Sequence, residues 1–260
     1  MDFRFGDEQQ MMAETVRGLL AETCRPADLR RLMASGETRD ATRWSALVEL
    51  GLQGVLVPES AGGLGLTAAD FVLVAEACGY AALPEPLVEN AGVALPLLAA
   101  LARDRRSAAI LDRALAGDIT IAVAHPANPF VADADTAGAV LCVRGGEVHL
   151  CDAEAVSLVP QPSVDPFRRL FAIADRPCPT TAIATVAEAS AAIDAALDHG
   201  ALFSAAQLVG IAQRAVDLAV AYAGERSQFG KPIGSYQAVK HLLATAQVKI
   251  EFARPVVYAA

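Results

Sequence analysis

The sequence feature that most constrains the fold is a turn between two long stretches with helical apolar spacing. Residues 185–225 contain no proline and repeat apolar side chains at helical intervals, which is the pattern of a long amphipathic helix. Gly230, Pro232 and Gly234 then let the chain leave that helix and bend. A second helical pattern begins at Gln237. The sequence therefore predicts a long antiparallel helical hairpin.

An arginine and an aromatic residue, Arg226 and Phe229, lie at this turn. A planar, permanently charged guanidinium beside an aromatic ring suits a phosphate next to a flat ring system, and a dinucleotide cofactor has both. An ordinary helix end explains the spacing as well. In that alternative Arg226 meets the negative end of the helix dipole and Phe229 closes the core of the hairpin.

The segment from Arg226 to Gln237, with a helix on each side, resembles the signature of the acyl-CoA dehydrogenase family. In that family the arginine and phenylalanine lie at a dimer contact. They hold the diphosphate and adenine side of an FAD bound mainly by the neighbouring subunit, with the glutamine close by. The resemblance implies that Arg226, Gln228, Phe229 and Gln237 bind FAD. It also implies an acyl-CoA substrate, an electron-transfer partner and a homo- or hetero-oligomer with a second chain of the family.

Composition excludes several other classes of protein. The chain has 260 residues, of which 54% are hydrophobic and 20% charged, as in a soluble protein of two or three domains. A net charge of -9 without a basic stripe argues against nucleic acid and, more weakly, against anionic membranes. The N-terminus has no signal-peptide pattern, and the most apolar run, residues 91–102, is too short to span a bilayer. We therefore expect a cytoplasmic protein that does not bind membranes.

Cysteine and histidine spacing gives no sign of a metal site. The five cysteines are scattered without a Cys-x-x-Cys pair, which indicates buried free thiols rather than disulfides or zinc ligands. The four histidines show no His-Glu-x-x-His pattern. We expect no bound metal.

The order of the patterns predicts an α+β fold. Helical patterns dominate residues 1–117, including a glycine-rich segment at 50–66 that resembles a packing turn of the family's N-terminal domain. Short alternating apolar runs in 118–185, with a Gly145-Gly146 hairpin turn, predict a small antiparallel β domain. Residues 186–260 give the helical hairpin. Because two helices alone would expose apolar stripes, we expect further residues of this chain, or another chain, to complete a four-helix bundle.

Two features depart from the family. After the first strand the family usually has a Thr/Ser-Glu-Pro-x-x-Gly-Ser-Asp-like segment that touches the flavin and, later, a tryptophan-containing segment. This chain has His125-Pro-Ala-Asn-Pro-Phe130 there, and its only tryptophan is Trp44. The family's catalytic glutamate lies after the hairpin or on the preceding helix near Gly200, where this chain has Asp198 and His199.

No catalytic residue is therefore assigned, and two hypotheses follow. In the first, the chain is a flavoprotein subunit that carries out FAD-dependent α,β-dehydrogenation of an acyl-CoA thioester. In the second, it is a non-catalytic subunit that completes the FAD site of a partner dehydrogenase chain.

Overall fold

The computed structural model describes residues 4–174 and 181–260. These residues form two compact units, each built from separate segments of the chain. The first combines the N-terminal segment up to Arg25 with Val72–Leu83 and Leu202–Ala260, and the second combines Pro26–Phe71 with Pro84–Ala201. Along the chain, helices precede strands and a helical hairpin follows, which confirms the predicted α+β fold class. The boundaries of the predicted domains, 1–117, 118–185 and 186–260, remain a prediction.

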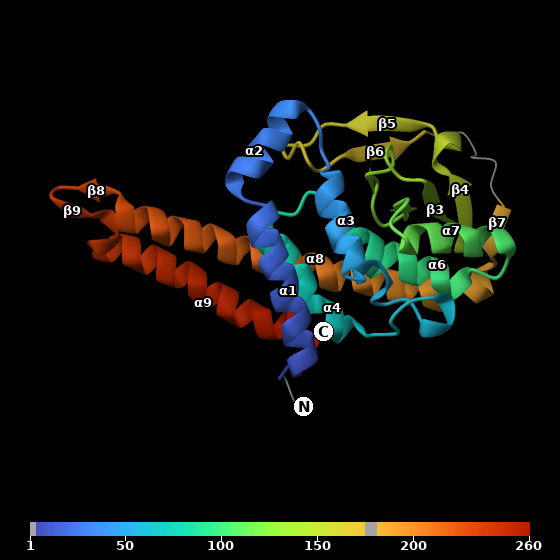
Figure 1. The fold of residues 1–260 in the computed structure, drawn as a ribbon, viewed down its shortest axis with the longest axis horizontal. Coiled ribbons are helices and arrows are strands. Elements are labelled where there is room, and N and C mark those ends of the chain that lie inside the picture. Colours follow the sequence, from blue (N-terminus) through green and yellow to red (C-terminus); the bar gives the residue numbers. More distant parts are fainter. Residues whose placement is uncertain (1–3, 175–180) are drawn as a thin grey trace. The chain divides into compact units, whose positions relative to one another are not determined.

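The first unit is helical and contains the predicted hairpin. It is formed by α1 (Asp7–Thr23), most of α4 (Ala68–Ala81), the second half of α8 (Val186–Glu225) and α9 (Gln237–Ala259). Figure 1 shows α9 returning alongside α8 from the β8–β9 turn. Hydrogen bonds of 3.0 and 3.1 Å between the side-chain amides of Gln213 and Gln247 join the two helices. The predicted helical hairpin, with its second helix starting at Gln237, is confirmed.

Two glycines allow α4 and α8 to pack backbone against backbone. A Cβ atom at Gly79 would lie 2.1 Å from the carbonyl oxygen of Gln207, and one at Gly210 would lie 2.0 Å from that of Glu76. Any larger residue would force the helices apart. A second link comes from the Tyr80 hydroxyl, which donates a hydrogen bond of 2.8 Å to Asp217.

The second unit has a helical part and a strand part. Its helical part comprises α2 (Pro26–Ser35), α3 (Ala41–Glu49), η1 (Leu52–Gly54), η2 (Glu59–Ala61), α5 (Leu87–Glu89), η3 (Asn90–Ala94), α6 (Leu95–Leu101) and α7 (Arg105–Leu115). The glycine-rich segment is a packing turn, as predicted, because a Cβ atom at Gly63 would lie 2.1 Å from the carbonyl oxygen of Val57. Gly62 and Gly65 adopt the left-handed conformation that favours glycine.

Buried polar groups connect separate segments of this unit. Glu85, in the loop before α5, forms an ion pair with Arg43 of α3, and both side chains are at most 2% exposed. Asn90 donates to the side-chain oxygen of Gln53 at 2.6 Å and accepts from the backbone N–H of Ile121 at 2.9 Å. Neither set of contacts has a local sequence pattern that would predict it.

Two small sheets make up the strand part. The first sheet has the strand order β1 (Ile121–Ala124), β3 (Ala139–Arg144), β4 (Glu147–Asp152) and β7 (Thr181–Ala184). The second sheet has the strand order β2 (Val131–Ala132), β6 (Leu170–Ile173) and β5 (Leu158–Gln161). A short helix, η4 (Ala153–Ala155), precedes β5. All pairings are antiparallel except β1 with β3, which is parallel. The predicted Gly145-Gly146 hairpin is confirmed, with both glycines at positive φ. Strands β2 and β7 were not predicted.

Apolar side chains of both parts of this unit meet in one core cluster. It includes residues of α6 and α7, of β3 and β4, and of the start of α8. A smaller cluster joins inward-facing residues of the two sheets, among them Cys142 and Cys151. Cys24 and Cys78 are also buried, as predicted, whereas Cys178 lies outside the described residues.

Candidate functional site

The turn between α8 and α9 is a short hairpin with a well-defined backbone. After α8 ends at Glu225, β8 (Ser227–Gln228) pairs with β9 (Lys231–Pro232), and η5 (Ile233–Ser235) leads into α9. The carbonyl of Arg226 accepts a hydrogen bond of 2.7 Å from the N–H of Ile233. A Cβ atom at Gly234 would lie 3.0 Å from the carbonyl oxygen of Ala223, so glycine permits the close return of the chain.

The side chain of Tyr236 contacts both strands at the tip of this hairpin. Its hydroxyl donates a hydrogen bond of 3.0 Å to the carbonyl of Gln228, and the ammonium group of Lys231 lies 4.3 Å from the centre of its ring. Contacts of this kind hold the hairpin in one conformation and leave its outer side chains unused. The tip is therefore a preformed surface.

Phe229 stands out because it combines backbone strain with exposure. It occupies the first position of the two-residue loop at φ 53°, in the left-handed region that bulky side chains avoid. Its side chain is 93% exposed. The alternative in which Phe229 closes the core of the hairpin is therefore wrong. A strained, exposed aromatic residue does not stabilise the fold of its own chain. Such residues are typical of binding sites.

The other predicted binding residues also lie on the outside of this hairpin. Arg226, Gln228 and Gln237 are all exposed. Among the residues that the structure describes, no carboxylate forms an ion pair with Arg226, whose backbone N–H donates to Tyr222 at 2.8 Å. The hairpin and the first residue of α9 thus present an accessible guanidinium, two side-chain amides and an aromatic ring. This set of donors suits a diphosphate beside an aromatic ring system.

We expect Phe229→Asn to stabilise the isolated chain. Asparagine tolerates the left-handed conformation, and an Asn-Gly pair is favoured in a two-residue hairpin loop. Because the ring is exposed, little packing is lost, and the free energy of unfolding should rise by about 1 kcal/mol. Chemical denaturation would measure this change. Phe229→Ala is the matched control, since it removes the ring but keeps the backbone strain; a gain of the same size in that variant would contradict the explanation.

Asp198 and His199, the two α8 side chains near Gly200, differ in their surroundings. His199 is half-buried and hydrogen-bonds to the backbone of Gly92, and burial lowers the pKa of its imidazole. Gly92 lies in η3, a single turn of π-helix, and Pro96 has no N–H to donate to its carbonyl. His199 therefore serves the packing of α8, while Asp198 is exposed. Within residues 4–174 and 181–260, no group of three or more metal-ligating side chains exists.

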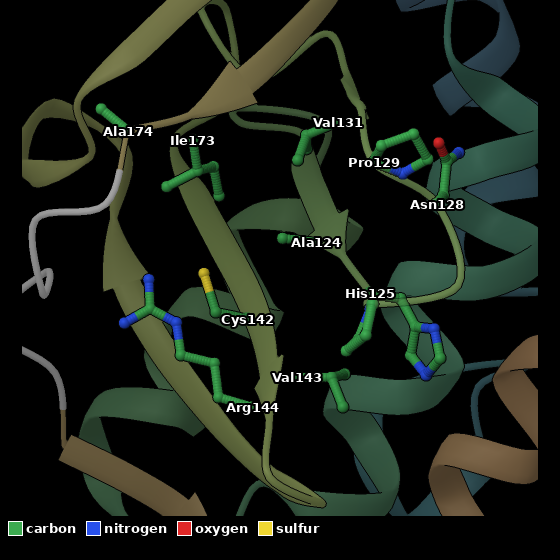
Figure 2. A pocket seen from close by; sticks show the side chains of 11 residues that line it. Ala124, His125, Asn128, Pro129, Val131, Cys142, Val143, Arg144, Ile173 and Ala174 are labelled. Atoms are coloured by element: carbon green, nitrogen blue, oxygen red, sulfur yellow. The ribbon is translucent and has the colours of Figure 1, made fainter.

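The segment that replaces the family's flavin-contacting sequence forms one wall of a pocket in the second unit. His125, Asn128 and Pro129 lie along this wall, opposite residues of β3 and β6 (Figure 2). Trp44 donates its indole N–H to the carbonyl of Gly117 at 2.9 Å, so it serves the packing of α3. Neither segment reproduces the side chains that the family usually places against a flavin ring.

Comparison with known proteins identifies the family. The family profile for the acyl-CoA dehydrogenase N-terminal domain matches residues 6–118, and that for the C-terminal domain matches residues 190–260. Acyl-CoA dehydrogenase IpdE2 of Mycobacterium tuberculosis is 35% identical to the chain over 256 residues, which cover 96% of the chain and 74% of that protein. The chain therefore belongs to the acyl-CoA dehydrogenase family and is similar to the IpdE2 proteins.

Solved structures share the fold. The ChsE4-ChsE5 complex of M. tuberculosis has a chain that matches with a TM-score of 0.77 and 22% identity, covering all of this chain and 78% of its own. An acyl-CoA dehydrogenase of Bacillus anthracis in complex with FAD matches with a TM-score of 0.79 and 19% identity, covering 98% of this chain and 50% of its own. Both likenesses extend over the helical and the strand segments.

Proposed function

We propose that the chain is a subunit of an FAD-dependent acyl-CoA dehydrogenase, and that its β8–β9 hairpin completes an FAD site whose other residues belong to a second chain. The observation that carries this proposal is the exposed, strained Phe229 beside the accessible Arg226. Both side chains are exposed, so they are available to a ligand that is bound mainly by another chain. The ChsE4-ChsE5 complex, an assembly that contains a chain of this fold, supports a hetero-oligomer.

Each residue of the hairpin has a distinct role in this site. The guanidinium of Arg226 would hold the diphosphate through charge-assisted hydrogen bonds, and the ring of Phe229 would lie against the adenine side. The amides of Gln228 and Gln237 would orient the same part of the cofactor. Because Tyr236 and Lys231 brace the hairpin before binding, little conformational entropy is lost when the cofactor binds.

The chemical step needs two further groups. When bound, FAD accepts the hydride from Cβ of an acyl-CoA thioester while a carboxylate removes the α-proton. Between Glu188 and Glu225 the sequence has no glutamate, and His199 is engaged by Gly92. The geometry thus favours the supporting role, in which the partner chain supplies the base and the flavin-ring contacts. A subunit that catalyses the reaction itself is the second candidate.

The other predicted partners follow from this assignment. An acyl-CoA thioester would be the substrate of the assembly in lipid metabolism, and an electron-transfer protein would reoxidise the flavin. Location in the cytoplasm remains a prediction. Among the described helices, α8 is long and apolar enough to cross a bilayer, but length and composition alone are weak evidence because a long core helix of a soluble protein meets the same criteria.

Flavin absorbance of the purified chain would test the proposal. The chain should be produced alone and together with a second acyl-CoA dehydrogenase-like chain, and the oligomeric mass measured with the visible spectrum. We expect a flavin band only from the mixed assembly. A flavin band at one FAD per chain, from a preparation that contains this chain alone and oxidises an acyl-CoA, would overturn the supporting role in favour of the catalytic one.

A further inference from the structure

A pocket of about 400 Å³ lies in the second unit, and none of the residues Arg226, Gln228, Phe229 and Gln237 lines it. Its walls come from the segment after β1, from β3 and from the end of β6. Figure 2 shows Arg144 and His125 on opposite sides of this pocket, with Cys142 between them. The size is in the range of sites for small organic ligands.

Part of the pocket lining is apolar. Ala124, Val131, Val143 and Ile173 supply aliphatic carbon atoms, and the buried Cys142 adds its thiol. Such a surface favours a ligand with an apolar body. A ligand without one would leave these side chains facing water.

The polar side chains of the pocket present mainly donors, because the acceptor atoms of His125 and Asn128 already receive backbone hydrogen bonds. Nδ1 of His125 accepts a hydrogen bond of 3.0 Å from the N–H of Ala127, so the neutral ring carries its proton on Nε2. Oδ1 of Asn128 accepts one of 3.0 Å from the N–H of Phe130, which leaves its NH₂ group as the unused end. Arg144 has donors only.

Arg144 is also without a counter-charge in the described parts of the chain. Its cross-strand neighbour is Glu147, but that carboxylate lies 3.3 Å from Nε2 of His149 instead. No described carboxylate forms an ion pair with Arg144, and none lines the pocket. Among the described side chains, the pocket thus offers a guanidinium and two N–H donor groups, which favours a ligand with negative charge.

We propose that this pocket binds a small amphipathic oxyanion, a carboxylate or phosphate group on an apolar body. Arg144 binds the anionic group of the ligand, and His125 and Asn128 donate hydrogen bonds to acceptors on the other side of the ligand. The aliphatic side chains of the pocket contact the apolar body. The site uses no residue of the β8–β9 hairpin, so it stands whether or not that hairpin binds FAD.

Binding of three matched naphthalene probes to the intact chain tests the proposal. Naphthalene-2-carboxylate and 2-naphthyl phosphate carry the two oxyanions, and naphthalene-2-carboxamide is their neutral counterpart. Saturation-transfer NMR detects binding, and titration gives the Kd. We expect at least one anion to bind about tenfold more tightly than the amide, because a charge-assisted hydrogen bond is added. The stronger of the two identifies the preferred anion.

Two arginine variants locate the bound probe. Arg144→Gln should weaken anion binding about tenfold, while Arg168→Gln, the same charge change at an exposed position of this unit, should leave it unchanged. Thermal unfolding of both variants controls for folding. The proposal is overturned if the amide binds as tightly as both anions, if the two variants behave alike, or if riboflavin displaces the probes with an affinity that does not depend on Arg144.

Discussion

Replacement of Arg226 by glutamine should strip FAD from the assembled dehydrogenase. The guanidinium has no ion-pair partner among the described residues, so its charge is available for the diphosphate. Loss of charge-assisted hydrogen bonds to a phosphate costs roughly 1.5–3 kcal/mol, which weakens FAD binding about 10- to 100-fold. The FAD content of the purified assembly and the Kd for added FAD would measure the effect.

Lys249→Gln is the matched control for this experiment. Lys249 is an exposed cation on α9, in the same unit as Arg226, and its replacement removes the same charge without touching the hairpin. FAD content should therefore stay unchanged. If Arg226→Gln kept its FAD but melted at a lower temperature, Arg226 would serve only the end of α8 through the helix dipole.

The sequence predicted those elements whose signals are local. Helical spacing and the breakers Pro232 and Gly234 located the α8–α9 hairpin, and Gly145-Gly146 located the β3–β4 turn, because each needs only a few neighbouring residues. The pairing of β1 with β3 depends on contacts across the chain, so no local pattern revealed that it is parallel. Strand β2 has two residues, too few to show alternation.

The sequence also placed the candidate binding residues, but not their exposure or strain. Nothing in the order Ser-Gln-Phe-Gly shows by itself that Phe229 occupies the left-handed region, although a two-residue loop ending in glycine could have suggested it. The donor character of the His125 and Asn128 side chains depends on hydrogen bonds that they accept from the backbone N–H groups of residues 127 and 130. Such information exists only once the loop has folded.

The largest loss of stability should follow from Glu85→Gln, which removes one charge of a buried ion pair. Nε and Nη2 of Arg43 donate to the two carboxylate oxygens of Glu85 at 2.6 and 2.8 Å, and the N–H of Asp40 donates to one of them at 2.8 Å. Glutamine keeps the shape but removes the buried counter-charge of the guanidinium, whose remaining acidic neighbour, Asp40, is partly exposed and lies 4.0 Å from Nη1. Breaking a buried pair in this way costs about 3–5 kcal/mol, which chemical denaturation would show.

Two further variants separate charge from packing in this result. Glu154→Gln makes the same change at an exposed position and should alter the free energy of unfolding by less than about 0.5 kcal/mol. The double variant Arg43→Met/Glu85→Met removes both charges and should recover part of the loss, because no uncompensated ion stays buried. A loss below about 1 kcal/mol in Glu85→Gln would mean that water reaches Arg43.

Since this pair and Arg226 belong to different compact units, we expect the FAD content per folded assembly to be unaffected by Glu85→Gln. This measurement separates a stability defect from a binding defect.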